Sequence, residues 1–323
     1  MSASSTGQRG DNAGTSIRCS VGVMAYNEEK NVGRLLERLL DQELRGVAVT
    51  EIIVVASGCT DGTEEVVRGV MERSGKVRLV VEAERGGKAS AIQRFLDLAA
   101  EDILVMVSAD TLPERDAVEL LVGAFADARV GMTGARPVPV SPDGGFCGAA
   151  VRFFWEMHHR AALRSPKCGE MVAFRKVTGT IPRDVVVDEP YVAAQVERAG
   201  LAVRYVPEAV VYNSGPSKAA EILSRRRNIV AGYFHLAARH GIRRRPAHRL
   251  HVAAFVLRKM LSPRARPHWV AAAAALELLA RFLGWLDFRF SRKPLHVWRP
   301  AATTRELPPD AGNAQRGKER REC

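Results

Sequence analysis

Four short polar segments, each following an apolar run, carry the residue types most able to bind a charged ligand. They read "AYNEE" (25–29), "ASGCTDGT" (56–63), "ERGGKAS" (84–90) and "SADT" (108–111). Taken singly, each has a structural explanation, such as Asn27 capping a helix or Asp61 opening a turn. Together they contain more Gly, Asn, Asp, Lys and Glu than turns alone require, and this favours a common binding site.

The third segment indicates phosphate binding. Gly86, Gly87 and Lys88 stand at a strand-to-helix junction, where backbone N–H groups and one ammonium group can approach a diphosphate. The segment is not a P-loop, because no Gly stands five residues before Gly87 and Ala89 replaces the Ser or Thr that would hold magnesium. No GxGxxG follows the first apolar run, which disfavours a dinucleotide-dependent dehydrogenase.

The elements that position these segments alternate between strand and helix patterns. Apolar strand-like runs occupy 17–24, 51–57, 77–83 and 102–110, and helical patterns lie between them at 32–40, 63–74 and 88–100. This alternation predicts an α/β fold with a right-handed, mostly parallel sheet flanked by helices. Ligands bind at the carboxyl ends of such strands, where all four polar segments would lie.

The second half of the chain is less regular. Pro113 is expected to open a helix that runs to about Asp127, and the proline-containing 130–140 is expected to be an edge strand. A helix over 145–163, a strand at 170–176, a helix over 190–199 and a strand at 202–207 complete the globular part. We expect five regions: a disordered leader (1–16), a donor-binding half (17–112), an acceptor-binding half (113–216), a basic helical region (217–300) and a disordered tail (301–323).

The order of these motifs resembles that of family 2 glycosyltransferases, which have a GT-A fold, over about Cys19 to Tyr233. The resemblance implies a nucleotide-sugar donor. Its base and ribose would bind the first polar segment (25–29) and Asp61 of the second. It also implies that Asp110, in the position of the family's DxD motif, binds Mg²⁺ or Mn²⁺ bridging the donor diphosphate. The donor-binding candidates are Ala25, Tyr26, Asn27, Glu28, Ser57, Asp61, Gly87, Lys88, Ser108, Ala109 and Asp110.

Ser108 departs from this motif, since it stands where a second acid is expected. One carboxylate suffices for a hard cation when phosphate oxygens and water complete its coordination shell. Asp110 is therefore the metal ligand that the sequence supports most.

The resemblance also implies a general base in "VVVDEPYVAAQVERAG" (185–200) and an inverting reaction. Asp188 and Glu189 are adjacent, and the spacing does not separate them. Counting back from Gly200 favours Glu189, whereas preference for the shorter acid favours Asp188, which we choose narrowly. The alternative is that both acids only offset the dipole of the following helix.

Two further segments are candidates for substrate contacts. Trp155, His158 and His159 could contact the acceptor, although Trp155 could also pack in the core. The run Arg225, Arg226 and Arg227 suits a diphosphate because guanidinium groups form paired hydrogen bonds to phosphate oxygens. The alternative for the run is a solvated basic helix face.

The net charge of +12 is concentrated near the C-terminus, because 218–299 holds 18 Lys and Arg residues against three acids. An anionic membrane surface would explain this excess, and no RRM, KH or helix-turn-helix signature suggests nucleic acid. The apolar stretch 269–288 contains Glu277, Arg281 and Asp287, which favours an interfacial helix over a buried soluble helix or a true membrane span.

The sequence therefore predicts a metal-dependent, inverting glycosyltransferase acting on a lipid-linked or glycan acceptor. Five cysteines without a CxxC pair and the lack of a visible signal sequence favour the cytoplasmic face of the membrane. A nucleotidyltransferase on a related sheet and a non-catalytic membrane-bound scaffold are the rival interpretations.

Overall fold

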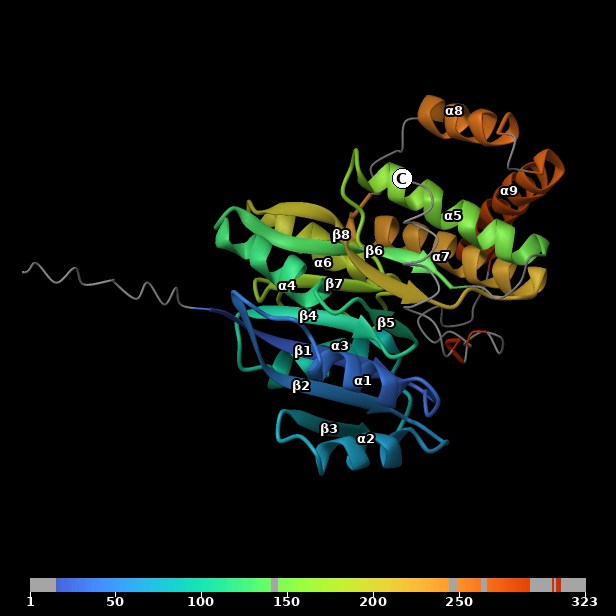
Figure 1. Ribbon diagram of the computed structural model, residues 1–323. Helices are drawn as coiled ribbons and strands as arrows, with labels where there is room; N and C mark the ends of the chain where they lie inside the picture. Colours follow the sequence, from blue (N-terminus) through green and yellow to red (C-terminus); the bar gives the residue numbers. More distant parts are fainter. Residues whose placement is uncertain are drawn as a thin grey trace, which may run out of the picture.

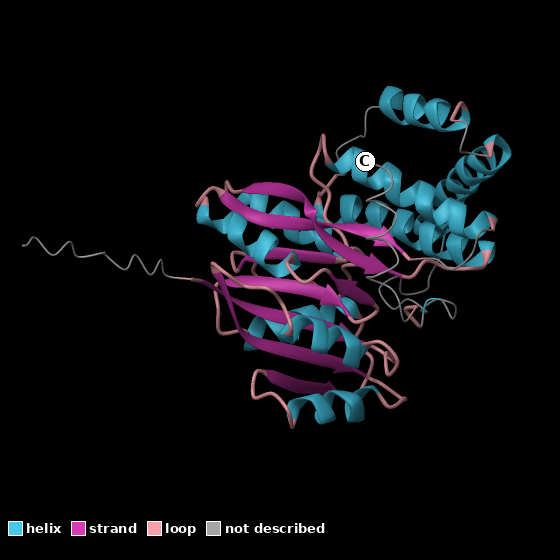
Figure 2. Cartoon of the chain, viewed as in Figure 1, coloured by secondary structure: helices cyan, strands magenta, loops and turns pink. Residues whose placement is uncertain are grey.

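A computed structural model describes residues 16–140, 145–243, 249–262, 266–290, 304 and 306–308. Its centre is an eight-stranded mixed sheet in the order β3-β2-β1-β4-β7-β6-β8-β5, with helices on both faces (Figures 1 and 2). The strands are β1 (Ile17–Ala25), β2 (Val47–Ser57), β3 (Val77–Glu82), β4 (Ile103–Ser108), β5 (Thr111–Pro113), β6 (Val130–Pro139), β7 (Met171–Arg175) and β8 (Ala202–Asn213). The helices are α1 (Val32–Leu40), α2 (Thr63–Met71), α3 (Lys88–Leu98), α4 (Ala117–Gly123), the short 3₁₀ helix η1 (Ala124–Ala126), α5 (Phe146–Ala162), α6 (Asp188–Arg198), α7 (Ala219–His240), α8 (Arg249–Met260) and α9 (Pro267–Phe290).

The parallel half of the sheet is as the sequence predicts. Strands β3, β2, β1 and β4 are parallel to their neighbours. Ile52 and Val54 of β2 enter the core under α1, α2 and α4, whereas Ile53 and Val55 enter the core under α3 and α6. Strands buried on both faces need nearly continuous apolar runs, and this is the pattern that the sequence shows.

The second half differs from the sequence-based expectation. Strand β6 lies inside the sheet between β7 and β8, so the prediction of an edge strand is wrong. Its pairing with β7 ends at Gly134, and Pro137 and Pro139 lie beyond that point, where β6 pairs with β8 alone. The missing N–H groups of these prolines therefore cost β6 no bond to β7. Pro113 ends strand β5 instead of opening a helix, and α4 begins at Ala117.

The C-terminal helices form a separate packed layer with α5. Phe153 of α5, Phe255 of α8 and Ala273 of α9 belong to one apolar cluster. Helix α9 lies against α7, and a Cβ at Gly284 would come within 2.7 Å of the Arg227 carbonyl oxygen. The close contact therefore requires glycine on α9 at this position.

The two acids of α9 face α7, whereas Arg281 and Arg289 are exposed. Glu277 accepts hydrogen bonds from Arg226 at 2.7 Å and from Arg281 at 3.0 Å, and Asp287 pairs with Arg227. The opposite side exposes large apolar side chains, namely Leu278, Leu279, Phe282, Trp285 and Phe290. By length and composition alone, with a mean hydropathy of 1.5, α9 is the one helix in the described residues that could cross a membrane.

Both predicted terminal regions fall largely outside the described residues, including 1–15 and most of 301–323. Residues 306–308, however, lie against α1. The Leu307 N–H donates to Asn31 Oδ1 at 2.9 Å, and Arg34 donates to the Leu307 carbonyl at 2.8 Å. Leu307 is buried in a cluster that includes Tyr212. These three residues are therefore packed against the sheet domain, and the disordered tail stays a prediction.

Candidate active site

One cavity of about 1200 Å³ lies at the carboxyl ends of β1, β2 and β4, bounded by α5, α6 and α7. Residues far apart in the sequence meet there. The predicted site residues that line it are Ala25, Tyr26, Glu28, Ser57, Gly87, Lys88, Ser108, Ala109, Asp110, Trp155, His158, Asp188, Glu189, Arg225 and Arg226. The candidate donor, base and acceptor residues named here therefore share one cavity.

Asn27 and Asp61 lie behind this lining and join the first two strand tips. Asn27 adopts a left-handed φ of 55°, and its side chain accepts a hydrogen bond from the Thr60 N–H at 2.8 Å. Asp61 accepts bonds from the N–H groups of Thr63 at 3.1 Å and Glu29 at 3.3 Å. Both side chains therefore fix the shape of the site from outside the cavity.

Tyr26 and Arg85 form a stacked pair on the cavity wall. The guanidinium carbon of Arg85 lies 3.7 Å from the centroid of the Tyr26 ring. A cation over an aromatic face is attracted by the quadrupole of the ring. Arg85 was not predicted as a site residue, and it adds a positive charge beside the Gly-Gly-Lys segment.

Gly87 and Lys88 begin helix α3. Gly87 has a φ of 85°, which residues with a Cβ rarely adopt, and this turn directs the chain into the helix. The Lys88 ammonium lies 3.0 Å from Asp188 Oδ2 as an ion pair and donates a hydrogen bond to Glu189 Oε1 at 3.3 Å. The predicted phosphate-binding cation therefore directly contacts both candidate bases.

The electrostatics of this cluster favour a proton acceptor that works near neutral pH. Asp188 is only 5% exposed, and burial together with the charge of Glu189 raises the pKa of Asp188 to about 6, although Lys88 opposes the shift. Burial alone would lower the pKa of Lys88, but the two carboxylates outweigh it and raise that pKa above its ordinary value. A buried acid with such a pKa can act as a general base.

Glu170 is a residue of the site that the sequence reasoning missed. It is the centre of a three-residue turn closed by the Met171 N–H and the Gly169 carbonyl at 2.7 Å, and its φ is 61°. Positive φ is uncommon outside glycine and marks local strain. The Ser108 N–H donates to the Glu170 carbonyl at 3.3 Å, which ties this turn to the tip that carries Asp110.

The Glu170 carboxylate interacts with charged and polar side chains of the cavity, namely Arg225, Asn213 and Asp110. It accepts hydrogen bonds from Arg225 at 2.8 Å and from Asn213 at 3.1 Å. Burial raises the pKa of Glu170, Arg225 opposes this and the nearby charge of Asp110 adds to it. Glu170 is therefore an acid that lines the same cavity as Asp110 and comes from a segment distant in the sequence. A single Glu before a strand gives no sequence signal of this role.

The three consecutive arginines of α7 do not act together. Successive helical residues point about 100° apart, so three neighbours cannot face one diphosphate. Arg225 binds Glu170, whereas Arg226 lines the cavity but pairs with Glu277 of α9. Arg227 pairs with Asp287 and lies outside the lining.

The candidate acceptor residues of α5 also separate. Trp155 and His158 line the cavity, and their rings meet edge to face with centroids 5.4 Å apart. His159 lies outside the lining, and its Nδ1 is 2.8 Å from the Tyr205 hydroxyl. Adjacent helical residues face different directions, which explains why the structure parts the two histidines.

Comparisons with known proteins agree with this geometry. The family model described as "Glycosyl transferase family 2" matches residues 20–181, about half of the chain. Glycosyltransferase AglE of Haloferax volcanii is 24% identical over 144 residues, which are 45% of this chain and 47% of that protein. Dolichol-phosphate mannosyltransferase of Mycosarcoma maydis is 29% identical over 134 residues, or 40% and 46% of the two chains. The chain thus spans about half the length of these relatives.

A solved structure shares the fold over most of its length. Mannosyltransferase PcManGT from Pyrobaculum calidifontis, in complex with GDP-Man and Mn²⁺, is similar over 87% of this chain and 89% of that one. The TM-score is 0.63 and the sequence identity is 22%. The prediction of an α/β fold of the GT-A type with flanking helices is confirmed by this likeness. The sheet that was predicted as mostly parallel is mixed, because β4–β7, β6–β7 and β5–β8 pair antiparallel.

Proposed function

The chain belongs to glycosyl transferase family 2, and from this premise we propose that it transfers a sugar from a nucleotide-diphosphate sugar to a hydroxyl group of a lipid-linked or glycan acceptor, with inversion. The observation that carries the proposal is the single cavity in which the strand tips meet the buried acid pair Asp188 and Glu189. The names of the two relatives, a glycosyltransferase and a dolichol-phosphate mannosyltransferase, support the reaction class and the lipid-linked acceptor.

In this proposal the donor lies along the strand tips. Tyr26 and Glu28 line the part of the cavity that receives the nucleoside, and Asn27 and Asp61 keep the two tips in register from behind. Lys88 and Arg85 provide the positive charge next to the diphosphate. The backbone N–H groups at the start of α3 add to this charge.

The residues at the β4 tip fit a divalent cation. Asp110 and Glu170 place two carboxylates in one charged group, and carboxylate oxygens are the ligands that Mg²⁺ and Mn²⁺ prefer. Such an ion, when bound, neutralises the departing nucleoside diphosphate. Arg225, which is paired with Glu170, keeps that carboxylate oriented and adds a positive charge at the same end of the cavity.

Asp188 is the proposed base. Its carboxylate accepts the proton of the acceptor hydroxyl while the hydroxyl oxygen forms a bond to the anomeric carbon. The bond between that carbon and the diphosphate oxygen breaks, and the nucleoside diphosphate leaves with the electron pair. Lys88, 3.0 Å from Asp188, stabilises the ionised form that accepts the proton. Trp155 and His158 lie where an acceptor sugar can stack and form hydrogen bonds.

We also propose that the basic C-terminal region binds an anionic membrane surface at the cytoplasmic face. Leu278, Phe282 and Trp285 of α9, Leu257 of α8 and Leu261 directly after α8 are exposed. The acids of α9 pair with α7, and its exposed residues are large apolar side chains together with Arg281 and Arg289, which suits a helix lying in the headgroup region of an anionic membrane. A lipid-linked acceptor would then reach the cavity from the membrane.

A donor panel tests the proposal. Purified protein is heated with GDP- and UDP-sugars, with and without Mn²⁺, since a ligand that binds only the folded state raises the unfolding temperature. We expect one donor to stabilise the protein in a Mn²⁺-dependent way, and we expect Asp110→Asn to abolish that dependence. Turnover should release a nucleoside diphosphate. Release of pyrophosphate from a nucleoside triphosphate would instead identify a nucleotidyltransferase, and stabilisation without turnover would favour a scaffold.

A further inference from the structure

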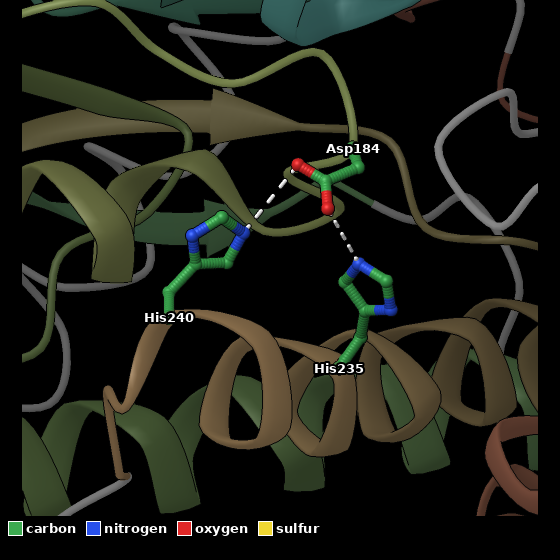
Figure 3. A group of neighbouring side chains, drawn as sticks. All are labelled: Asp184, His235 and His240. Atoms are coloured by element: carbon green, nitrogen blue, oxygen red, sulfur yellow. Dashed lines mark hydrogen bonds and ion pairs between the residues drawn. The ribbon is translucent and has the colours of Figure 1, made fainter.

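Asp184, His235 and His240 form a cluster that the proposed reaction does not use. Asp184 belongs to the loop between β7 and α6, and the two histidines lie in the last turns of α7 (Figure 3). Asp184 Oδ2 is 3.2 Å from His235 Nε2, and Asp184 Oδ1 is 3.4 Å from His240 Nε2. One ligand atom from each residue lies within 4.8 Å of the other two. We propose that this cluster binds a Zn²⁺ ion that fastens the loop before Asp188 to the end of α7.

The spacing of the ligand atoms suits a tetrahedral ion. Zinc binds imidazole nitrogen and carboxylate oxygen at about 2.0–2.2 Å, which places neighbouring ligands about 3.3 Å apart. His235 Nε2 and His240 Nε2 lie 3.2 and 3.4 Å from different oxygens of Asp184, and one ligand atom from each residue lies within 4.8 Å of the other two, so the three side chains converge at about this spacing. Three protein ligands leave one position for water, and the Asp184 side chain is 41% exposed, which gives solvent access to that position.

His240 gives a second indication. Its Nε2 atom is buried and makes no hydrogen bond, although it points at the Asp184 carboxylate (Figure 3). A buried polar atom that makes no hydrogen bond typically costs about 1–3 kcal/mol, and an ion or water at the site can offset this cost. A metal ion that accepts the Nε2 lone pair would do so.

The ligand types favour zinc over the cation proposed at Asp110. Two imidazoles and one carboxylate suit Zn²⁺, whereas Mg²⁺ and Mn²⁺ prefer oxygen ligands. A zinc ligand must be deprotonated, so the carboxylate binds in its ionised form and each imidazole binds in its neutral form.

The position of the cluster links it to the proposed active site. Asp184 is followed directly by Val185, Val186 and Val187, which line the cavity and lead into Asp188. On the other side, the His240 ring packs edge-on against Tyr191 of α6, with centroids 5.5 Å apart. An ion held here would restrict the loop that presents the proposed base.

The sequence spacing does not reveal this site. His235 and His240 are five residues apart, whereas two ligands on one helix face are usually three or four apart. They converge because His240 is the last residue of α7, before Gly241 turns the chain with a φ of 67°. Asp184 then approaches from a separate loop.

Metal binding is measured on untagged, full-length protein treated with a chelator. We expect about one Zn²⁺ per chain by elemental mass spectrometry, and a rise in unfolding temperature with Zn²⁺ but not with Mg²⁺. Asp184→Asn and His240→Ala should each weaken Zn²⁺ binding at least about tenfold. His268→Ala is the matched control, because His268 is exposed on α9, and it should bind Zn²⁺ like the natural chain.

A second readout needs no donor and reports on the loop itself. Arg183 is exposed and directly precedes Asp184, so trypsin can cut there. Zn²⁺ should slow this cut in the natural protein and in His268→Ala, but not in His240→Ala, whose fold is checked by circular dichroism. Zn²⁺ binding that persists in both ligand variants would overturn the proposal, as would a chelated protein that binds no Zn²⁺. Donor binding with Mg²⁺ is assayed separately, so failure here leaves the proposed reaction untouched.

Discussion

Asp188→Asn gives the most direct test of the proposed mechanism. Asparagine has nearly the same shape but accepts no proton at neutral pH, and Asp188 is 5% exposed, so water replaces the base poorly. A positioned general base contributes about 10²–10⁴-fold to the rate. This corresponds to about 3–5 kcal/mol of transition-state stabilisation. We therefore expect kcat to fall by that factor while donor binding changes little.

The pH dependence of the activity tests whether the base must be ionised. The base works only when ionised, and its pKa of about 6 lies above the ordinary value of 3.8. Activity should therefore be constant above pH about 6 and fall roughly tenfold per unit below it. The same raised pKa contributes stability that is present below pH 3.8 and lost as the pH rises through about 6. Glu189→Gln removes a negative neighbour and should move the acid limb of activity to lower pH.

The assay follows nucleoside diphosphate release with the donor selected by thermal shift. Donor-induced stabilisation of each variant serves as the control for folding and binding. If kcat falls in Glu189→Gln but not in Asp188→Asn, the base is Glu189. If both variants keep more than about a tenth of the natural rate, with the acid limb unchanged, the reasoning about this acid pair is refuted.

Three other perturbations follow from the described contacts. Glu170→Gln should keep the fold but raise the Mn²⁺ concentration needed for half-maximal activity by about ten- to a hundredfold; an unchanged requirement would show that Glu170 does not assist the ion. Phe282→Ser, at a side chain 58% exposed on α9, should reduce sedimentation with anionic vesicles about tenfold or more without altering donor stabilisation; equal sedimentation would count against the membrane surface. Leu307→Ala should lower the free energy of unfolding in urea by about 2 kcal/mol. Glu306→Ala, at an exposed ion pair, should change it little. Equal urea midpoints for Leu307→Ala and the natural protein would mean that residues 306–308 are not docked in solution.

The sequence was sufficient to predict the strands of the parallel half of the sheet. Buried runs such as 51–57 have one local cause, because a strand covered on both faces must be apolar throughout. The candidate donor tips followed from the rule that ligands bind at the carboxyl ends of parallel strands. The resemblance to family 2 glycosyltransferases narrowed the candidate base to Asp188 and Glu189, which match the family's acidic motif before a helix.

What depends on chain segments meeting in space was decided by the tertiary structure alone. The prolines of β6 suggested an edge strand. In the structure β6 lies between β7 and β8, two strands that follow much later in the chain. Ser108 suggested a missing acid, yet Glu170, in a turn with positive φ, lines the same cavity as Asp110. The local pattern encodes which face of an element is buried. It does not encode which distant side chain will share a cavity, because that depends on how the packed elements close around it.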